Sequence, residues 1–326
     1  MLFLFLEGMV KKSVLVVTPF HERYVKALES LDLDIDFVGC SDNNDSPEDL
    51  STFEVGVAWK VDPLLLKRWK SLKWIQMVSA GADEMLDTLS ERKDVVITSV
   101  RGIHANPIAT YVLMMMPMIS MGIPKMINNQ NSSTWKQWSW NDLEGKILCQ
   151  VGLGAIGKEI AKRARQAGMI IKGVKNNIST DENYEYIDEM FSSDNIEFAI
   201  KDCDYCVLAL PLTEKTRNLF SQKVFSCMEN KPFFINVGRG ELVNDRDLLK
   251  SIDNELLSGA VLDVFHEEPL SPDSPLWLHE KVIVTPHISG LTRDYMRKVC
   301  DVFAGNWSLW NEGKDLKRKV DRFDGY

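Results

Sequence analysis

The sequence predicts an α/β fold with two doubly wound parallel sheets, one nested inside the other along the chain. Apolar segments of strand length alternate with amphipathic segments of helix length over most of the 326 residues. That alternation is typical of a parallel sheet with helices on both faces. The length also suffices for two domains of ordinary size, each with its own core.

The first hundred residues carry this alternation most clearly. Strands are expected at residues 13–18, 35–38, 55–58, 74–78 and 95–98, and helices at 25–31 and 63–70. The alternation ends at His104, and a long apolar helix is expected from Ile108 to Met121. Because it is apolar all round, we expect it to be buried, in a core or against a second subunit. The polar segment Asn128–Asn141 is expected to be a surface connection.

The segment from Lys146 to Lys175 predicts a strand, a tight turn, a helix and a second strand. Its turn contains Gly152, Gly154 and Gly157 in the spacing GxGxxG. Glycine is needed there because the turn is tight, a pyrophosphate approaches the backbone and the helix packs closely on the strand. The helix N-terminus adds free N–H groups and partial positive charge. The segment therefore predicts a dinucleotide site.

The remaining chain continues the alternation to a final helix. Strands are expected at 205–210, 233–236, 259–264 and 282–285, and helices at 245–251 and 293–310. The six cysteines are scattered, and the pair Cys203 and Cys206 has no nearby histidine to complete a zinc site. We expect Cys206 to be a small residue of a buried strand, and we expect no metal.

Charge and hydropathy limit the classes of partner. The net charge of -9 argues against binding to nucleic acid or to an anionic membrane surface, because both bind basic protein surfaces. The apolar run Leu2–Leu6 is short and lacks the basic start of a targeting segment, so residues 1–8 are expected to be non-structural. The run Tyr111–Met121 is too short to cross a bilayer. We therefore expect a cytoplasmic protein.

Three later segments each follow the end of an expected strand, where open α/β sheets bind ligands. They are Asn236–Gly240, Asp263–Pro269 and Thr285–Gly290. Taken singly, their Arg239, Glu268 and His287 have ordinary explanations as solvated charges or a loop histidine. Their succession after a dinucleotide turn indicates one site.

These segments and the glycine turn together resemble the D-isomer-specific 2-hydroxyacid dehydrogenase family over nearly the whole chain. Trp74–Gly81 and Leu210–Thr216 are similar to further family loops, and residues 320–326 resemble the glyoxylate/hydroxypyruvate reductase branch. The resemblance implies a Rossmann-type dinucleotide-binding domain, residues 104–290, inserted into a flavodoxin-like substrate domain, residues 1–103 and 291–326.

The chemistry of the three charged groups agrees with this resemblance. Reduction of a 2-keto acid needs a cation for the carboxylate, an acid for the keto oxygen and a hydride donor. Arg239 offers a rigid fork of donors. Histidine is the side-chain type whose unperturbed pKa lies near neutrality, so His287 is the natural proton donor. By resemblance, Glu268 hydrogen-bonds the far ring nitrogen of His287, and a carboxylate there favours imidazolium.

The resemblance also implies binding residues. Backbone N–H groups of Ser79, Ala80 and Gly81, with Arg239 and His287, are expected to bind the substrate; the alternative for the first three is a plain Ser-Ala-Gly turn. Asp263 is similar to a family position near the nicotinamide carboxamide. The expected cofactor-binding residues are Gly152, Gly154, Ala155, Ile156, Gly157, Lys175, Asn176, Leu210, Pro211, Thr216, Val237, Gly238, Arg239, Asp263, His287 and Gly290.

The sequence departs from the family pattern at two positions. Lys175 stands where an acid usually holds the adenosine ribose. A lysine attracts a 2′-phosphate instead, so NADP(H) is favoured over NAD(H), and Asn176, Asn177 and Ser179 add potential hydrogen bonds. Alternatively, Lys175 points into water and both cofactors bind. Thr110 replaces a glutamate of many family members.

We therefore expect a homodimeric 2-keto acid reductase, paired through its dinucleotide-binding domain and acting on a small substrate such as glyoxylate or hydroxypyruvate. One alternative is a phosphoglycerate dehydrogenase. A substrate phosphate would need several cations near the pocket, however, and the candidates are few: Lys60 and Arg101. Another is a dinucleotide-sensing binding protein similar to the C-terminal-binding corepressors, which would not require the full set of Arg239, Glu268 and His287.

Overall fold

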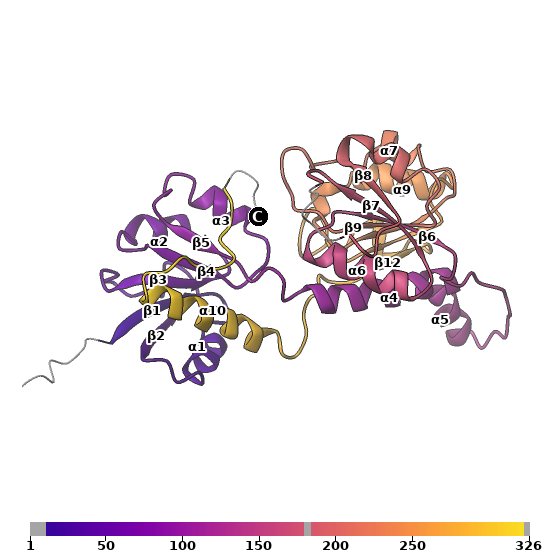
Figure 1. Ribbon diagram of the computed structural model, residues 1–326. Coiled ribbons are helices and arrows are strands. Elements are labelled where there is room, and N and C mark those ends of the chain that lie inside the picture. Colours follow the sequence, from indigo (N-terminus) through magenta and orange to yellow (C-terminus); the bar gives the residue numbers. More distant parts are fainter. Residues whose placement is uncertain (1–10, 179–183, 323–326) are drawn as a thin grey trace, which may run out of the picture. The chain divides into compact units, whose positions relative to one another are not determined.

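The computed structural model describes residues 11–178 and 184–322 (Figure 1). They form two compact units. The inner unit is His104–Leu291, and the outer unit comprises the described residues of Met1–Ile103 and Thr292–Tyr326. This division falls one residue beyond the expected boundary at Gly290. The predictions for residues 1–8, for Ser179 and for the end of 320–326 concern parts outside the described residues.

The outer unit contains a parallel five-stranded sheet in the order β2-β1-β3-β4-β5. Its strands are β1 (Lys12–Val17), β2 (Ile35–Cys40), β3 (Phe53–Ala58), β4 (Trp74–Met77) and β5 (Val96–Thr98). Its helices are α1 (His21–Glu29), α2 (Pro63–Arg68), α3 (Asp83–Thr88) and α10 (Tyr295–Asn311). This strand order is that of flavodoxin-like folds, as predicted.

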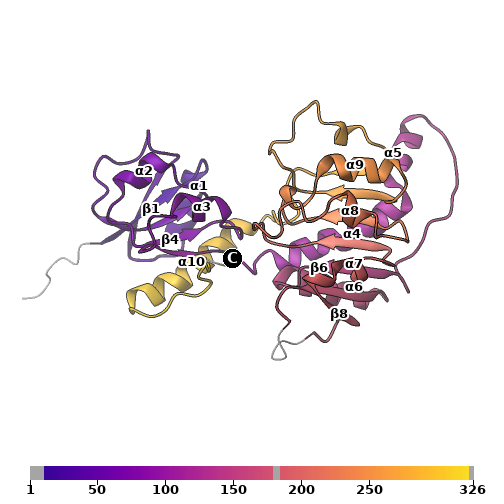
Figure 2. The same cartoon turned by 90° about the horizontal axis from the view of Figure 1, so that it is seen from above.

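Alternation along β1 builds a core on each face of this sheet. Val14 and Val16 pack in the cluster of α1 and α10, whereas Leu15 and Val17 pack in the cluster of α2 and α3. Successive strand side chains point to opposite faces, so a buried parallel strand reads as a continuous apolar run. Figure 1 shows α2 and α3 on one side of the strands and α1 and α10 on the other, and Figure 2 shows the same elements from above.

The C-terminal segment is tied to this sheet through a buried polar network. Asn306 of α10 donates to Gln76 Oε1 at 3.1 Å, and Gln76 in turn accepts from Thr98 at 2.9 Å. Asn306 also exchanges hydrogen bonds with the backbone of Lys317 at 2.9 and 3.1 Å. The network fixes the return of the chain beside β5, where Lys319 bridges Thr98.

The inner unit contains a parallel seven-stranded sheet in the order β12-β11-β10-β9-β6-β7-β8. Its strands are β6 (Ile147–Val151), β7 (Ile170–Lys175), β8 (Glu189–Ser192), β9 (Tyr205–Leu208), β10 (Phe233–Asn236), β11 (Gly259–Leu262) and β12 (Val282–Val284). Chain order reverses between β6 and β9, and such a switch point is where open α/β sheets bind ligands. The predicted Rossmann-type sheet is confirmed.

Helices cover both faces of the inner sheet. They are α4 (Ala105–Met121), α5 (Ile123–Asn131), α6 (Ala155–Gln166), α7 (Ile196–Ala199), α8 (Gln222–Phe225) and α9 (Asp245–Asp253). One buried cluster joins the sheet to α4 and α6, and another joins it to α7, α8 and α9. Thr110 of α4 contributes to the first face, since its hydroxyl accepts from Arg163 of α6 at 2.5 Å.

The structure refines one expectation for this unit and corrects another. On α4, Met115 and Met116 are buried within the unit, whereas Met114 is 52% exposed, so the expected burial of Met114 against a second subunit stays a prediction. The surface connection expected at residues 128–141 begins inside a helix, since α5 extends to Asn131. Helix α5 and the edge strand β8 were missed because they are short and weakly buried, which leaves little hydrophobic period to detect.

Among residues 11–178 and 184–322, no single helix has both the length and the hydropathy needed to cross a membrane. Helices α4 and α5 reach those limits only when taken together, and they are bent by 59° where they meet.

The network at Asn306 predicts the stability of the outer unit. Replacement of Asn306 by Ala should lower the free energy of unfolding by about 1–3 kcal/mol, because it leaves buried partners unsatisfied. Urea denaturation followed by tryptophan fluorescence measures the change. Ser308→Ala on the exposed face of α10 is the matched control and should change stability by less than about 0.5 kcal/mol. Equal effects of the two substitutions would contradict the assigned role of Asn306.

Candidate active site

The glycine turn joins β6 to α6 at the switch point of the inner sheet. Gly152 has a φ of +94°, and a Cβ atom added there would lie 2.5 Å from the Ala209 carbonyl oxygen. At Gly157, a Cβ atom would lie 1.8 Å from the Gly152 carbonyl oxygen. At Gly154 it would meet no described atom within 4 Å. The fold itself therefore requires glycine at two positions, and the third leaves open space beside the helix N-terminus, as a bound pyrophosphate needs.

The loop after β9 borders this turn. The Leu210 side chain would be 2.9 Å from a Cβ atom added at Gly152. Thr216 closes the loop by donating to the Pro211 carbonyl at 2.8 Å and accepting from the Thr213 N–H at 2.8 Å. The predicted residues Leu210, Pro211 and Thr216 thus lie at the same sheet edge as the glycine turn.

A cluster of cations and one aromatic ring lies where β7 ends. Lys175 Nζ is 3.4 Å from the Tyr184 hydroxyl and 5.7 Å from the centre of that ring. Lys158, in the first turn of α6, lies 5.1 Å from the same ring. Asn176 accepts a hydrogen bond from Ser193 at 3.0 Å. Two ammonium groups at this edge suit a phosphate, and the position of Lys158 directly after the third glycine was the signal that sequence reasoning missed.

Arg239 lies in a turn that the side chain of Asn236 stabilises through two hydrogen bonds. The buried Asn236 accepts from the Gly238 N–H at 3.0 Å and donates to the Arg239 carbonyl at 2.8 Å. A Cβ atom added at Gly238 would lie 2.9 Å from the Leu210 carbonyl oxygen, so this turn packs on the loop after β9. Arg239 itself is half-buried and donates to the Gly238 carbonyl at 2.8 Å.

Glu268 and His287 form the predicted pair. His287 Nδ1 lies 2.7 Å from Glu268 Oε2, and Glu268 Oε1 accepts from the Phe265 N–H at 3.0 Å. Burial raises the pKa of Glu268, but the hydrogen bonds from His287 and Phe265 and the charge of Arg239 outweigh it, so this pKa lies below its ordinary value. The three predicted catalytic residues therefore meet at the carboxyl ends of β10, β11 and β12.

Asp263 holds the loop that carries His287. Its fully buried carboxylate accepts from the Thr285 hydroxyl at 2.5 Å and from the N–H groups of Ile288 and Ser289 at 3.0 Å each. These bonds support a left-handed backbone at His287, whose φ is +50°. Tyr111 of α4 extends the network by bonding Thr285 at 2.7 Å. Thus Asp263 positions His287, and contact with a carboxamide stays a prediction.

The remaining inner-unit predictions lie beside these residues. Val237 is buried within the Arg239 turn, and Ala155 and Ile156 form the first turn of α6. Gly290 packs on the start of α4, since a Cβ atom there would lie 2.8 Å from His104 Cδ2. Cys206 is fully buried in β9, as expected. No group of metal-binding side chains occurs among the residues that the structure describes.

Ser79, Ala80 and Gly81 belong to the outer unit, where they follow β4. The Ser79 hydroxyl donates to the Gly81 carbonyl at 2.8 Å, and the Val100 N–H donates to the Ser79 carbonyl at 3.2 Å. The Tyr295 hydroxyl donates to the Val78 carbonyl. This loop is thus held by the segment after β5 and by α10, both in its own unit.

The lowered pKa of Glu268 predicts a pH-dependent stability. Ionised Glu268 stabilises the fold fully above its ordinary pKa of 4.5, and this contribution is lost as the pH falls through the lowered folded value. The effect should be small because the side chain is 37% exposed. Thermal unfolding from pH 7 to 3 should show wild type and Glu268→Gln converging below about pH 4.5. A gap between them that stays constant with pH would contradict this account.

Comparison with known proteins supports the family resemblance seen in the sequence. The model of the D-isomer-specific 2-hydroxyacid dehydrogenase NAD-binding domain matches residues 113–289, more than half of the chain. Glyoxylate/hydroxypyruvate reductase B of Klebsiella pneumoniae subsp. pneumoniae is 29% identical over 259 residues, which cover 76% of this chain and 78% of that protein.

Solved structures agree. A D-isomer-specific 2-hydroxyacid dehydrogenase family protein from Aeromonas salmonicida subsp. salmonicida is 28% identical, with a TM-score of 0.85 over 96% of this chain and 99% of that one. The NADPH-dependent glyoxylate/hydroxypyruvate reductase from Sinorhizobium meliloti, solved with NADP and sulfate, is 26% identical, with a TM-score of 0.87 over 97% of this chain and 100% of that one. The glycine turn, the paired Glu268 and His287, and the extent of these matches show that the chain belongs to the D-isomer-specific 2-hydroxyacid dehydrogenase family.

Proposed function

We propose that the chain is an NADPH-dependent reductase of small 2-keto acids, such as glyoxylate or hydroxypyruvate, with His287 as the proton donor. The observation that carries the proposal is the 2.7 Å contact between His287 and Glu268, with Arg239 close enough to act on the same carboxylate. The names of the Klebsiella and Sinorhizobium relatives support this substrate class. A protein that only senses a dinucleotide would not need this pair.

Each side chain has a distinct part in the reaction. Bound NADPH supplies the hydride that adds to the keto carbon. Arg239 binds the substrate carboxylate and polarises the carbonyl through its fork of donors. Since Nδ1 of His287 is engaged by Glu268, Nε2 is the nitrogen that donates the proton to the keto oxygen. Glu268 keeps the imidazolium loaded for that transfer, and the product is a 2-hydroxy acid.

The cofactor preference rests on the end of β7. Lys175 and Lys158 flank Tyr184 there, and Lys175 stands where an acid usually binds the ribose. Two positive charges attract the 2′-phosphate of NADP(H). Because NAD(H) lacks this phosphate, we expect the site to select NADP(H) over NAD(H). The Sinorhizobium relative was solved with NADP. The Ser79–Gly81 backbone is the proposed second grip on the substrate carboxylate.

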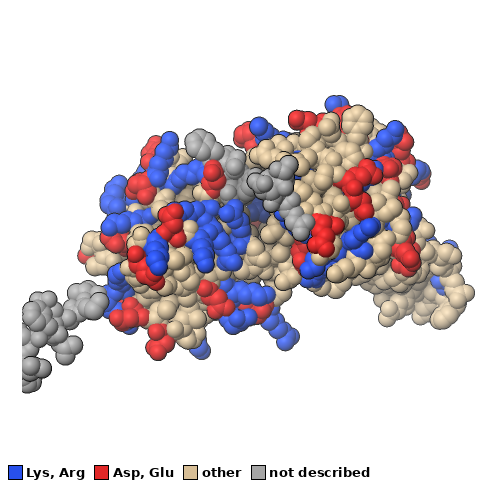
Figure 3. All heavy atoms as spheres, in the orientation of Figure 1, with Lys and Arg blue, Asp and Glu red and all other residues tan. Residues whose placement is uncertain are grey.

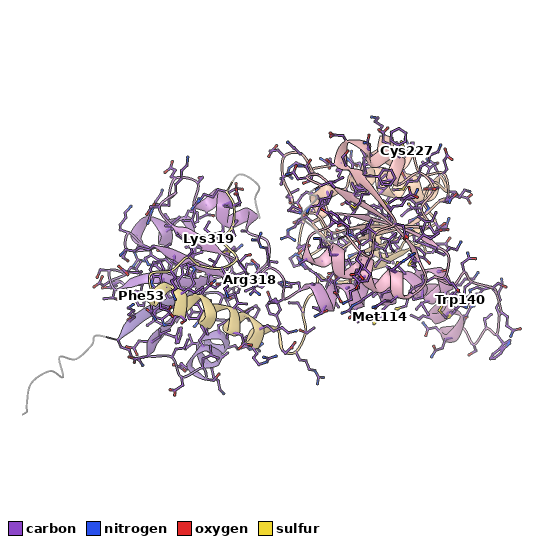
Figure 4. All side chains as sticks on the ribbon, viewed as in Figure 1. Phe53, Met114, Trp140, Cys227, Arg318 and Lys319 are labelled. Carbon is purple, nitrogen blue, oxygen red and sulfur yellow. The ribbon has the colours of Figure 1, made fainter. Side chains whose placement is uncertain are left out.

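We further propose a cytoplasmic homodimer that pairs through the inner unit. Large apolar side chains are exposed on it, including Met114 at 52%, Ile127 at 52% and Trp135 at 91%. Figure 4 shows Met114 and Trp140 among them. Such exposure supports a protein interface. All six cysteines are free thiols, which supports a reducing compartment.

Loss of the imidazole tests the proton donor. His287→Gln should lower kcat by about 10² to 10⁴, because the keto oxygen loses its acid. NADPH oxidation at saturating glyoxylate measures this, and the Kd of NADPH, from fluorescence titration, reports whether the cofactor site is intact. The matched control is His279→Gln, the same substitution at a histidine that contacts Asp253 outside the site. Unchanged turnover in His287→Gln would remove the residue from the mechanism.

A pair of glycine substitutions tests the cofactor site. Gly157→Ala should destabilise the inner unit, because the new Cβ atom meets the Gly152 carbonyl at 1.8 Å. Gly154→Ala meets no described atom within 4 Å, so its melting temperature should stay within about 2 °C of wild type. Its NADPH affinity should nevertheless fall at least about tenfold, because the methyl group enters the space proposed for the pyrophosphate. Unchanged affinity would contradict that placement.

A further inference from the structure

We propose that Tyr111 of α4 is a positioning residue for the proton donor His287. It acts through two intermediate side chains, Thr285 and Asp263. The inference rests on the proposed reductase function and deepens it, because it assigns a helix residue outside the active-site loops to the same proton transfer. Its basis is a chain of hydrogen bonds that lies within the inner unit and runs from α4 to the loop of His287.

The first link is the placement of the tyrosine ring. Helix α4 packs against β10 and β11. Tyr111 and Val112 lie in the same buried cluster as Ile235 and Val261 of those strands. A buried tyrosine usually finds a partner for its hydroxyl, and the partner here is the Thr285 hydroxyl at 2.7 Å. The core therefore fixes the ring, and its hydroxyl reaches the residue that directly follows β12.

The number of protons determines the direction of these hydrogen bonds. A hydroxyl has one proton to donate and can accept two further bonds. Thr285 donates its proton to Asp263 Oδ1 at 2.5 Å, so Tyr111 is the donor in its own bond with Thr285. Burial raises the pKa of Tyr111, and the charge of Asp263 adds to the rise, although the bond with Thr285 lowers it. The phenol therefore keeps its proton, and each bond in the chain points toward the carboxylate.

Asp263 connects this chain to the histidine through both its side chain and its backbone. Its carboxylate accepts from the N–H groups of Ile288 and Ser289 at 3.0 Å each, and its carbonyl accepts from the His287 N–H at 2.9 Å. The carboxylate is fully buried, unlike the acidic side chains that Figure 3 shows on the surface of the inner unit. A buried carboxylate depends on its donors for its orientation. Thr285 and Ile288 share Oδ1, so the hydroxyl chain and the histidine loop hold the same oxygen.

The expected effect on the reaction is geometric. The backbone of His287 is left-handed, with a φ of +50°. Such a conformation persists only while the surrounding bonds hold it. Without the Tyr111 hydroxyl, the Thr285 side chain loses the donor that fixes its rotation, and the carboxylate of Asp263 is held less firmly. A small displacement of the imidazole then slows proton transfer, because the rate depends on the placement of the donor atom.

A matched pair of tyrosine substitutions tests the inference. Tyr111→Phe removes the hydroxyl and keeps the ring, so kcat for NADPH-dependent reduction of glyoxylate should fall about fivefold or more. The Kd of NADPH, from fluorescence titration, should stay unchanged. The control is Tyr205→Phe, a buried tyrosine at the amino end of β9, whose hydroxyl contacts the Met116 carbonyl of the same helix at 3.5 Å. A wild-type kcat in Tyr111→Phe, or an equal fall in Tyr205→Phe, would overturn the inference.

Substitutions of the middle residue test whether the hydroxyls act in one chain. Thr285→Val removes the hydroxyl and should lower kcat at least as much as Tyr111→Phe does, whereas Thr285→Ser keeps it and should be faster than Thr285→Val. The double variant Tyr111→Phe, Thr285→Val should be no slower than Thr285→Val alone, because the chain is already broken. Losses that multiply in the double variant, or a serine variant as slow as the valine variant, would contradict the chain.

Failure of the reductase proposal is distinguishable from failure of this one. If wild type reduces no keto acid, the reductase proposal falls. The position of the imidazole is then measured without turnover, by NMR of protein with ¹³C-labelled histidine rings. The chain has five histidines, and the signal that disappears in His287→Gln belongs to His287. Tyr111→Phe should shift this signal and Tyr205→Phe should leave it in place. An unshifted signal in Tyr111→Phe would overturn the positioning role.

Discussion

The inner unit depends on one buried carboxylate, that of Asp263. A charge without solvent contact is costly unless hydrogen bonds replace the lost water. Here the hydroxyl of Thr285 and the N–H groups of Ile288 and Ser289 replace it. Because all three donors come from the loop around His287, satisfying the charge also fixes the position of the histidine. The left-handed backbone at His287 persists because these bonds overdetermine it.

Two groups of charged side chains lie at different places along the carboxyl edge of the inner sheet. Three side chains lie at the ends of β10, β11 and β12. His287 is hydrogen-bonded to Glu268, and the charge of Arg239 acts on the same carboxylate. At the end of β7, Lys158 and Lys175 present cations beside Tyr184. The first arrangement combines a proton-exchanging imidazole with a carboxylate that is hydrogen-bonded to it. The second arrangement places two ammonium groups beside one aromatic ring, which suits an anionic ligand.

Backbone geometry adds to these side chains. In the glycine turn, neighbouring protein atoms leave no room for a Cβ atom at Gly152 or Gly157. At Gly154 a Cβ atom would meet no described atom within 4 Å. In the outer unit, hydrogen bonds from Val100 to Ser79 and from Tyr295 to Val78 hold the Ser79–Gly81 loop to the rest of the unit. Rigid backbone donors bind anions with little loss of conformational entropy on binding, which is why such turns recur where a carboxylate or phosphate is held.

The sequence by itself determined the strand and helix alternation, the glycine turn and the identities of Arg239, Glu268 and His287. These are local features: a hydrophobic period, a spacing of glycines, and charged residues after strand ends. Only the tertiary structure revealed Asn236, Tyr111 and Thr285 as supports and the contact of Lys158 with the Tyr184 ring. Such groups come from segments far apart in the chain, and no local pattern records which strand ends become neighbours in a sheet.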